Sequence, residues 1–431
     1  MRVGIITIGS WGDIQPYIAL GKGFQRAGYE VRLFTHGAYG SAVRREGLDF
    51  LDLGVDPQTV MEGVMRETRL GERPNRIPFA RQITFMREAL REAQPLLKEG
   101  AERCWQAAQD IDALFFNPIG IYVAVPFAQR RKIPSFAAYV QPISPTREFA
   151  SVLFPPAPGW LSPVRPVYNR LSASCVEWFR WPIYRGSIGK AVQAVLGTPL
   201  RSPIAPMRRE RSPIFYGFSA HFLPRPSDWP DFCHVTGYWF LDTPGDWEPP
   251  ADLRAFLQAG PPPVYVGFGS MRSSDPLKLT AAVIQALERC GQRGILLSGW
   301  GAIAQMPLPD TVLTIDAVPH DWLFPRVAAV VHHGGSGTTA AGLRAGVPSL
   351  IVPFIGDQSF WGWEVHERGL GPRPLDPNTL EAEGLAQAIG SMITDQDMRQ
   401  RAARVGEQIR SEDGVGNVIR LFEQSVRSSP G

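Results

Sequence analysis

Val331–Trp363 reads VHHGGSGTTAAGLRAGVPSLIVPFIGDQSFWGW, and this stretch decides the fold expected of the chain. It continues an apolar run over 327–331 whose length suits a buried parallel strand. Histidines and glycines follow at once, and 338–344 then has a helical composition that stops at a Gly-Val-Pro ending. A second apolar run over 349–352 leads into a loop. The pattern predicts a strand, a glycine-rich turn, a helix and a second strand.

A turn of this composition is typical of anion binding. Glycines let the backbone come close to a ligand, and free N–H groups at a helix N-terminus point at a phosphate. His333 lies at the start of the expected helix and can donate a further hydrogen bond, and the Thr338 hydroxyl follows. The string is neither GxGxxG nor GxxxxGK[ST]. A turn that only tightens a corner is the alternative, but the histidines, the threonines and Asp357-Gln358 favour a binding site.

The N-terminus predicts a second unit of the same kind. Residues 3–8 form a buried-strand pattern, 9–13 form a turn, and a helix follows that Gly28 ends. The next expected strand covers 30–34. A strand-helix-strand start is the mark of a doubly wound parallel sheet.

Both blocks resemble the UDP-glycosyltransferase superfamily. HHGGSGTTAAGLRAGVPSLIVPFIGDQSFW resembles its donor-binding signature, and GSWGDIQPYIALGKGFQRAGYEVRLFTH resembles its N-terminal block. The similarity is greatest to the bacterial and fungal sterol 3-beta-glucosyltransferases and related natural-product glycosyltransferases. It implies an α/β protein of the GT-B fold, with two Rossmann-like doubly wound domains facing each other across a cleft. We expect an acceptor-binding domain over 1–225, a nucleotide-sugar-binding domain over 226–395, and C-terminal helices over 396–431 that pack back on the first domain.

The resemblance also implies which residues hold the donor. The glycine-rich turn would bind the diphosphate, Asp357 and Gln358 the sugar hydroxyls, and the loop around Val318 the nucleobase. The turn after the expected strand 264–268 would reach the phosphates. The expected donor-binding residues are Ser270, Val318, His320, His333, Gly335, Ser336, Gly337, Thr338, Asp357 and Gln358. Trp322 is expected to be structural, because the stacking tryptophan of the plant branch corresponds to Ala317, and Ala341 replaces the glutamate that binds ribose there.

Asp13 matches the position at which this branch carries the catalytic base. An aspartate before a helix is also an ordinary N-cap, worth about 1 kcal/mol. As an N-cap it would have a lowered pKa and be a weak base at neutral pH. Asn117 takes the place of the aspartate that supports a catalytic histidine in other branches, so no His–Asp pair is expected. Trp11 replaces the arginine that is frequent at its position.

A chain of 431 residues is too long for one small core and suits two α/β domains. Its 44% hydrophobic and 20% charged residues are an ordinary globular composition. A net charge of +3 and no basic block interleaved with aromatics argue against nucleic-acid binding. Four scattered cysteines are typical of free thiols. No run suits a signal peptide or a membrane span, so a cytoplasmic protein with peripheral membrane contact as an open option is expected.

No metal and no cofactor are expected beyond the nucleotide-sugar co-substrate. Two DxD strings, Asp110–Asp112 and Asp395–Asp397, match the pattern of metal-dependent glycosyltransferases. Both lie at the edges of helical patterns, where aspartates are common caps, and this interpretation is favoured.

Residues 144–211 are the least regular part of the sequence. Prolines alternate with aromatic residues there, among them Phe154, Trp160, Tyr168, Trp178, Phe179, Trp181 and Tyr184. Such a cluster lines an apolar acceptor site, touches a membrane surface, or forms the core of an insertion. The three interpretations remain open, as do two for the arginines over 201–211, a solvated surface or a site for anionic lipid head groups.

The expected function is that of an inverting glycosyltransferase, which moves glucose from UDP-glucose to a hydroxyl of an apolar acceptor such as a sterol or triterpenoid. A dTDP-sugar is the second donor. The alternatives are transfer to a macrolide, glycopeptide, flavonoid or carotenoid, a glycolipid glycosyltransferase, a sugar-nucleotide 2-epimerase, and a catalytically silent binding partner. The Asp-Gln signature and the Asp13 block argue against the epimerase, and the retained phosphate turn and base argue against the silent homologue.

Overall fold

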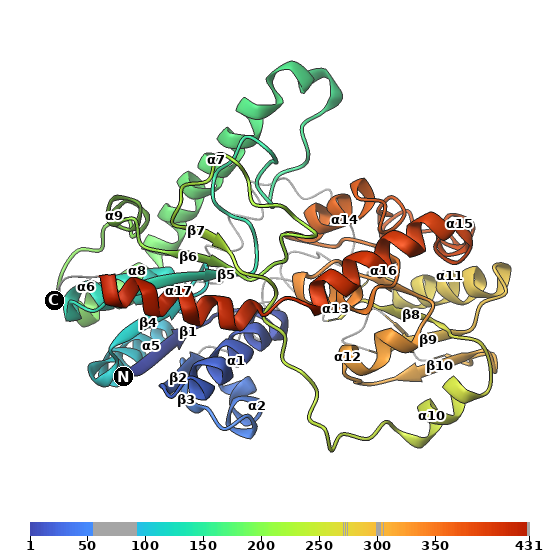
Figure 1. The fold of residues 1–431 in the computed structure, drawn as a ribbon, viewed down its shortest axis with the longest axis horizontal. Coiled ribbons are helices and arrows are strands. Elements are labelled where there is room, and N and C mark those ends of the chain that lie inside the picture. Colours follow the sequence, from blue (N-terminus) through green and yellow to red (C-terminus); the bar gives the residue numbers. More distant parts are fainter. Residues whose placement is uncertain are drawn as a thin grey trace.

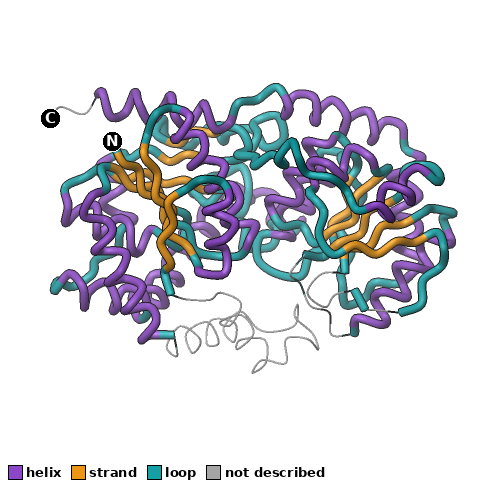
Figure 2. The backbone as a smooth tube through the Cα atoms, turned by 90° about the horizontal axis from the view of Figure 1, so that it is seen from below, coloured by secondary structure: helices purple, strands orange, loops and turns teal. Residues whose placement is uncertain are grey.

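The structure is a computed structural model that describes residues 1–54, 93–269, 271, 273, 275–298, 303–304 and 306–428. Two separate parallel sheets, each surrounded by helices, lie side by side in this part of the chain (Figure 1, Figure 2). This is the two-domain α/β architecture that the sequence predicts.

The first sheet has seven parallel strands in the order β3-β2-β1-β4-β5-β6-β7. Its strands are β1 (Arg2–Ile6), β2 (Glu30–Thr35), β3 (Asp49–Asp52), β4 (Ala113–Phe116), β5 (Ser135–Tyr139), β6 (Ile214–Tyr216) and β7 (Cys233–Val235). The strand order reverses between β1 and β4. In doubly wound sheets, ligands bind beyond the carboxyl ends of the strands at such a switch point.

The helices of the first domain cover both faces of this sheet (Figure 1). They are α1 (Trp11–Arg26), α2 (Gly40–Arg45), α5 (Gln94–Ala107), α6 (Ile121–Arg131), α7 (Arg165–Gly186), α8 (Ile188–Leu196) and α9 (Ile204–Glu210). Side chains alternate along the strands as the pleat requires. Phe115 and Phe136 are buried with α1, whereas Phe116 and Tyr139 are buried with α6 and α8 on the other face.

The second sheet has five parallel strands in the order β10-β9-β8-β11-β12. Its strands are β8 (Val264–Gly267), β9 (Gly294–Leu297), β10 (Val312–Ile315), β11 (Ala329–His332) and β12 (Ser349–Ile351). Its helices are α10 (Ala251–Gln258), α11 (Pro276–Arg289), α12 (His320–Leu323), α13 (Ser336–Ala345), α14 (Gln358–Glu367), α15 (Ala382–Thr394) and α16 (Gln396–Arg410). Its switch point lies between β8 and β11, directly before the glycine-rich turn.

The C-terminal helix α17 (Gly414–Ser428) crosses back to the first domain (Figure 1). Phe422 is fully buried there, and its ring meets Phe24 at 5.3 Å, Phe136 at 5.2 Å and Phe115 at 5.5 Å. Helix α16, by contrast, packs on α13 and α15 beside the second sheet. Within the expected segment 396–431, the return to the first domain is therefore made by α17.

The first sheet extends beyond the expected boundary at 225. Strand β7 joins its edge, and Trp229, just before this strand, is buried against Tyr216 with ring centroids 4.4 Å apart. The crossing to the second domain follows β7. Thr243 in this connection donates its backbone N–H to Asp321 of α12 at 2.8 Å, which anchors the connection to the second domain.

The two domains share an aromatic contact. Trp361 of α14 is 1% exposed and stacks on Phe222 of the first domain at 6.1 Å, and Phe360 meets Phe149 at 5.4 Å. Arg368 adds a hydrogen bond from its Nε to the carbonyl of Phe222.

Among the described residues no helix is long and apolar enough to cross a membrane. The cysteines, all of them in the described ranges, form no disulfide.

Candidate active site

The glycine-rich turn ends at the N-terminus of α13. Gly335 is the N-cap, and Ser336, Gly337 and Thr338 form the first turn, whose backbone N–H groups have no partner within a helix. Gly334 has a φ of +90°, and a Cβ there would lie 2.6 Å from Ile351, so this position requires glycine. A Cβ on Gly337 would meet no described atom within 4 Å. The helix start is therefore open at Gly337, as an anion-binding turn needs.

Two buried histidines stand beside this helix start. Burial lowers the pKa of His333 to about 4, so the ring is neutral, and its Nδ1 has no hydrogen-bond partner among the described residues. His332 accepts the N–H of Gly334 at its Nδ1 at 3.0 Å, while its buried Nε2 likewise finds no described partner. A buried polar atom without a partner costs about 1–3 kcal/mol. A bound ligand group would remove part of that cost.

Val318 and His320, the two residues expected to contact the nucleobase, lie in different surroundings. Val318 is half-buried beside the apolar cluster under α12. His320 stacks on Phe324 at 4.4 Å and meets the edge of Tyr265, and burial lowers its pKa to about 4. Its ring thus packs against two aromatic side chains. Ser270, also expected here, lies outside the described residues.

Trp322 belongs to the packing of the second domain. Its ring meets Trp247 at 5.3 Å, and the guanidinium of Arg326 lies 4.3 Å from its centroid. These contacts agree with the structural role expected from the sequence.

Asp357 and Gln358 lie at the start of α14, where the loop after β12 ends. Asp357 accepts a hydrogen bond from Trp361 Nε1 at 2.9 Å. Burial raises the pKa of Asp357 to about 6, and the negative charge of Asp13 adds to the rise. Gln358 is 5% exposed, and its Oε1 accepts the backbone N–H groups of Phe354 at 2.7 Å and Ile355 at 3.0 Å. Its amide oxygen therefore shapes the loop, and its Nε2 donates to the Sδ of Met271 at 3.5 Å.

Asp13 is in the first turn of α1, and Ser10 is the N-cap. The two form a capping box, in which Oδ2 of Asp13 accepts the backbone N–H and the hydroxyl of Ser10, both at 2.9 Å. Burial raises the pKa of Asp13, although the bonds from Ser10 act in the opposite direction. Asp13 is therefore not the N-cap, and its pKa is raised where a lowered one was expected, because desolvation outweighs the hydrogen bonds from Ser10. A raised pKa makes the carboxylate a better base at neutral pH.

Gln141 is the residue that sequence reasoning missed. It follows β5, and its side-chain amide acts on the carboxyl groups of both Asp13 in the first domain and Asp357 in the second. This interaction lowers the pKa of each carboxyl. Its position after a buried strand at the carboxyl edge of the sheet was the available signal.

The two signature blocks meet in space. Helices α1 and α13 contact each other, and the charge of Asp13 acts on Asp357. Asn117 is used elsewhere: its Nδ2 donates to the carbonyl of Ile8 at 2.7 Å, and its Oδ1 accepts the N–H of Gly120 at 2.8 Å. Asn117 thus ties the loop after β1 to the start of α6.

Both DxD strings have structural partners. Asp110 pairs with Arg2 and Arg32, and Asp112 accepts the backbone N–H of Arg2 at 2.7 Å. Asp395 caps α16 by accepting the N–H of Met398 at 2.9 Å. These contacts support the structural interpretation of both strings.

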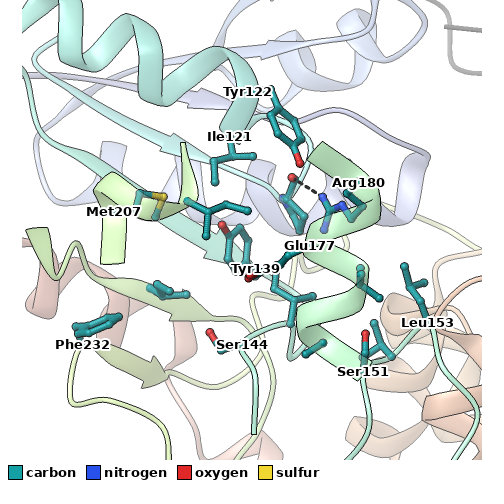
Figure 3. Close-up of a pocket in the computed structure, with 17 residues that line it drawn as sticks. Ile121, Tyr122, Tyr139, Ser144, Ser151, Leu153, Glu177, Arg180, Met207 and Phe232 are labelled. Carbon is teal, nitrogen blue, oxygen red and sulfur yellow. Dashed lines mark hydrogen bonds between the residues drawn. The ribbon is translucent and has the colours of Figure 1, made fainter. Parts of the chain in front are cut away.

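A mainly apolar pocket lies between α7 and the first sheet (Figure 3). Arg180 of α7 donates to the carbonyl of Pro118 at 2.8 Å at its polar end. Ser144 lines the pocket three residues after Gln141, which links the pocket to the candidate base along the chain. The lining residues are Pro118, Ile121, Tyr122, Tyr139, Ile143, Ser144, Ser151, Val152, Leu153, Ala173, Val176, Glu177, Arg180, Ile204, Met207, Ile214 and Phe232.

Two family profiles match the chain. The glycosyltransferase family 28 N-terminal domain matches residues 3–136, and the erythromycin biosynthesis protein CIII-like C-terminal domain matches residues 302–423. Each match contains one of the two signature blocks.

Sterol 3-beta-glucosyltransferases are similar over the full chain. One from Arabidopsis thaliana is 37% identical over 435 residues, covering 100% of this chain and 66% of the relative. One from Emericella nidulans is 34% identical over 438 residues, covering 99% of this chain and 30% of the relative. The chain thus spans just under two thirds of the plant protein and less than a third of the fungal one.

Solved structures agree on the fold. The calicheamicin glycosyltransferase CalG4 superposes with a TM-score of 0.69 at 18% identity, covering 100% of this chain and 99% of that one. The two family profiles and the sterol glucosyltransferase relatives point to glycosyltransferases as well, so the fold and the sequence indicate the same group of proteins. The chain belongs to the glycosyltransferases of the GT-B fold and is related within them to the sterol 3-beta-glucosyltransferases.

Proposed function

We propose that the protein is an inverting glycosyltransferase that moves glucose from UDP-glucose to a hydroxyl group of a sterol or another flat apolar acceptor. The observation that carries the proposal is the meeting of Asp13 on α1 with Asp357 and the open N-terminus of α13, which lie on different domains. This arrangement supports a base on one side of the reacting sugar and a diphosphate site on the other. The sterol 3-beta-glucosyltransferase relatives support the choice of sugar and acceptor.

Asp13 would remove the proton of the acceptor hydroxyl as its oxygen attacks the anomeric carbon. The bond from that carbon to the diphosphate oxygen breaks in the same step, so UDP leaves with the electron pair and an α-linked donor gives a β-glycoside. The raised pKa of Asp13 supports this role, because a base works best when its pKa approaches the working pH.

The diphosphate would lie against the first turn of α13. The N–H groups of Ser336, Gly337 and Thr338 are oriented along the helix axis, and the helix dipole favours the charge that develops on the leaving group. Neutral His333 has a single N–H, which would donate to a phosphate oxygen in place of its hydrogen bond with the backbone of Gly267. We propose that these groups stabilise the leaving UDP without a metal ion.

Asp357 and Gln358 would bind the sugar hydroxyls. Because Oε1 of Gln358 is used by the loop backbone and one N–H of Nε2 by Met271, its contribution would be the second N–H of Nε2, and Asp357 would supply the acceptor oxygens. Asp357 has a pKa of about 6, so it is mostly ionised at neutral pH and accepts strong hydrogen bonds.

The acceptor body would lie in the pocket between α7 and the first sheet. Aromatic and aliphatic side chains dominate its lining, and a few polar groups such as Ser144 and Glu177 can orient a hydroxyl. Sterols reside in membranes, since they are nearly insoluble in water, and the proposal therefore includes peripheral contact with a membrane surface.

The first test is transfer from UDP-glucose to a panel of sterols, triterpenoids, flavonoids and a macrolide, with EDTA present, beside the Asp13→Asn variant. We expect a sterol β-glucoside that forms in EDTA. The variant should keep its affinity for UDP and lose about 10²- to 10⁴-fold in kcat, the usual contribution of a general base. Asn retains the size of the side chain and an oxygen that accepts from Ser10, so thermal stability should change little.

Three results would contradict parts of the proposal. Preference for a dTDP-sugar would replace the donor, and preference for the macrolide would replace the acceptor. Loss of transfer in EDTA, restored by a divalent ion, would overturn the metal-free leaving-group step. Tight UDP binding with no transfer to any acceptor would favour a binding partner over an enzyme.

A further inference from the structure

An exposed apolar face runs along α7 and the 3₁₀ turn before it, Gly159–Val164. Its side chains are spaced three, four or seven residues apart, which is one or two helical turns, so they share one side of the helix. We call this set the α7 face: Trp160, Val164, Val167, Leu171 and Trp178, with exposed fractions of 79%, 48%, 58%, 57% and 72%.

The α7 face concentrates the exposed apolar side chains of the described residues. Of the twelve large hydrophobic side chains exposed there, seven lie between Leu153 and Phe179. Single exposed apolar residues are ordinary, whereas a contiguous group marks an interaction site. Helix α7 and the loop before it also project beyond the rest of the molecule (Figure 1). A flat partner can therefore reach this face without meeting either domain.

The charges around the α7 face favour an anionic partner. Exposed Arg165, Arg170 and Arg185 lie on the same helix. Its single acidic residue, Glu177, is half-buried and lines the pocket. Tryptophans beside arginines are typical of surfaces that enter the head-group region of a bilayer, where the ring is amphipathic and the cation meets anionic lipid. A protein partner would not require this pairing.

The opposite side of the same helix lines the pocket. Ala173, Val176 and Arg180 face the pocket, while Leu171 and Trp178 face solvent. Leu153 does both, since it lines the pocket and is 46% exposed, and it lies at the outer edge of the pocket residues (Figure 3). Leu153 thus gives the pocket an exposed apolar edge.

We infer that the α7 face docks on a bilayer that carries anionic lipids, and that an apolar acceptor passes from the bilayer past Leu153 into the pocket. The docking step stands on the exposed residues and charges alone. The passage step rests on the proposed function, because it assigns the pocket to the acceptor.

Vesicle flotation tests the docking step. The full chain is mixed with phosphatidylcholine vesicles that contain or lack phosphatidylglycerol. The Trp160→Ser/Trp178→Ser variant should bind at least about tenfold more weakly, because two large apolar side chains leave the interface. The matched control is Leu277→Ser, which changes a side chain that is 59% exposed on α11 of the second domain and should not alter binding. An Arg165→Gln/Arg170→Gln variant should lose the preference for phosphatidylglycerol and keep its weak binding to phosphatidylcholine.

Equal binding of the tryptophan variant and the unchanged protein would overturn docking by the α7 face. Sedimentation velocity tests whether a second copy of the chain covers the α7 face instead. A dimer that forms in the unchanged protein and is lost in the tryptophan variant would assign the face to that second copy. Circular dichroism and the melting temperature of each variant establish that it is folded, as is expected for changes to exposed side chains.

The passage step is tested by supplying the same acceptor either in vesicles or in a soluble carrier. The tryptophan variant should lose kcat/KM for a sterol embedded in vesicles and keep it for the same sterol carried by cyclodextrin. Equal losses in both would overturn passage from the bilayer. Vesicle binding without transfer to any acceptor of the panel would leave docking in place and remove the proposed function, so the two failures are distinguishable.

Discussion

Two carboxyl groups from different domains share one amide at the candidate active site. The side-chain amide of Gln141 acts on both Asp13 and Asp357, and each carboxyl has a pKa raised chiefly by burial. Two nearby carboxylates resist simultaneous ionisation, so the site stores unfavourable charge when no ligand is present. Such a cost is expected where a site is built for binding and chemistry rather than for stability.

The carboxyl of Asp357 should therefore lower stability at neutral pH. Its folded pKa of about 6 is above the unfolded value of 3.8, so the folded state holds the proton more tightly, and stability falls as pH rises through this window. Asp357→Asn should be as stable as the unchanged protein at pH 4 and more stable at pH 8, by about 1–2 kcal/mol after allowance for partial exposure. Urea unfolding at both pH values measures this, and a loss of stability at pH 8 would contradict it. The variant should also have a lower kcat/KM for UDP-glucose.

At the scale of single elements, the first turn of α13 offers a test that separates binding from folding. Gly337→Ala should leave the melting temperature unchanged or slightly higher, because the added Cβ meets no described atom and alanine favours a helix. It should raise the KM for the donor about tenfold or more, since the methyl group would stand where backbone and phosphate approach. Gly384→Ala is the matched control, in the first turn of α15 and also facing open space. An unchanged KM in Gly337→Ala would remove this turn from the donor site.

Helix α17 should be required for the stability of the first domain. Phe422 is fully buried among Phe24, Phe115 and Phe136, rings that the chain contributes some three hundred residues earlier or more. Phe422→Ala should cost about 3–5 kcal/mol, the usual range for a buried phenylalanine. Denaturant unfolding measures the loss. Exposed Arg420→Ala on the same helix should cost well under 1 kcal/mol; comparable losses would contradict the proposed packing.

Across the whole molecule, Gln141 couples the two domains electrostatically. Its amide lowers the pKa of Asp13 and of Asp357, so Gln141→Ala should raise both. The acid limb of the kcat/KM profile should then move to higher pH, so activity should fall more on the acidic side of the profile than on the alkaline side. Gln129→Ala, an exposed change on α6, should leave the profile in place. An unmoved acid limb would show that Gln141 does not act on the carboxyl of the proposed base, Asp13.

Local pattern determined which segments become strands and turns. The apolar runs before 9–13 and 332–337 became β1 and β11, and the helices after them start within a few residues of the expected positions. Backbone preference and hydrophobic periodicity act over a few residues, so they can be read from sequence. Helix α7 could not be read in this way, because apolar residues on its exposed face obscure the periodicity of its buried one.

The sequence by itself determined the two doubly wound sheets, the glycine-rich helix start and the identity of the candidate base. Only the tertiary structure decided how that base behaves. The pKa of Asp13 depends on the atoms that bury it, and the meeting of Asp13 with Asp357 beside Gln141 depends on how the two domains pack. Desolvation and charge–charge interaction depend on distance in space, and sequence separation does not encode that distance.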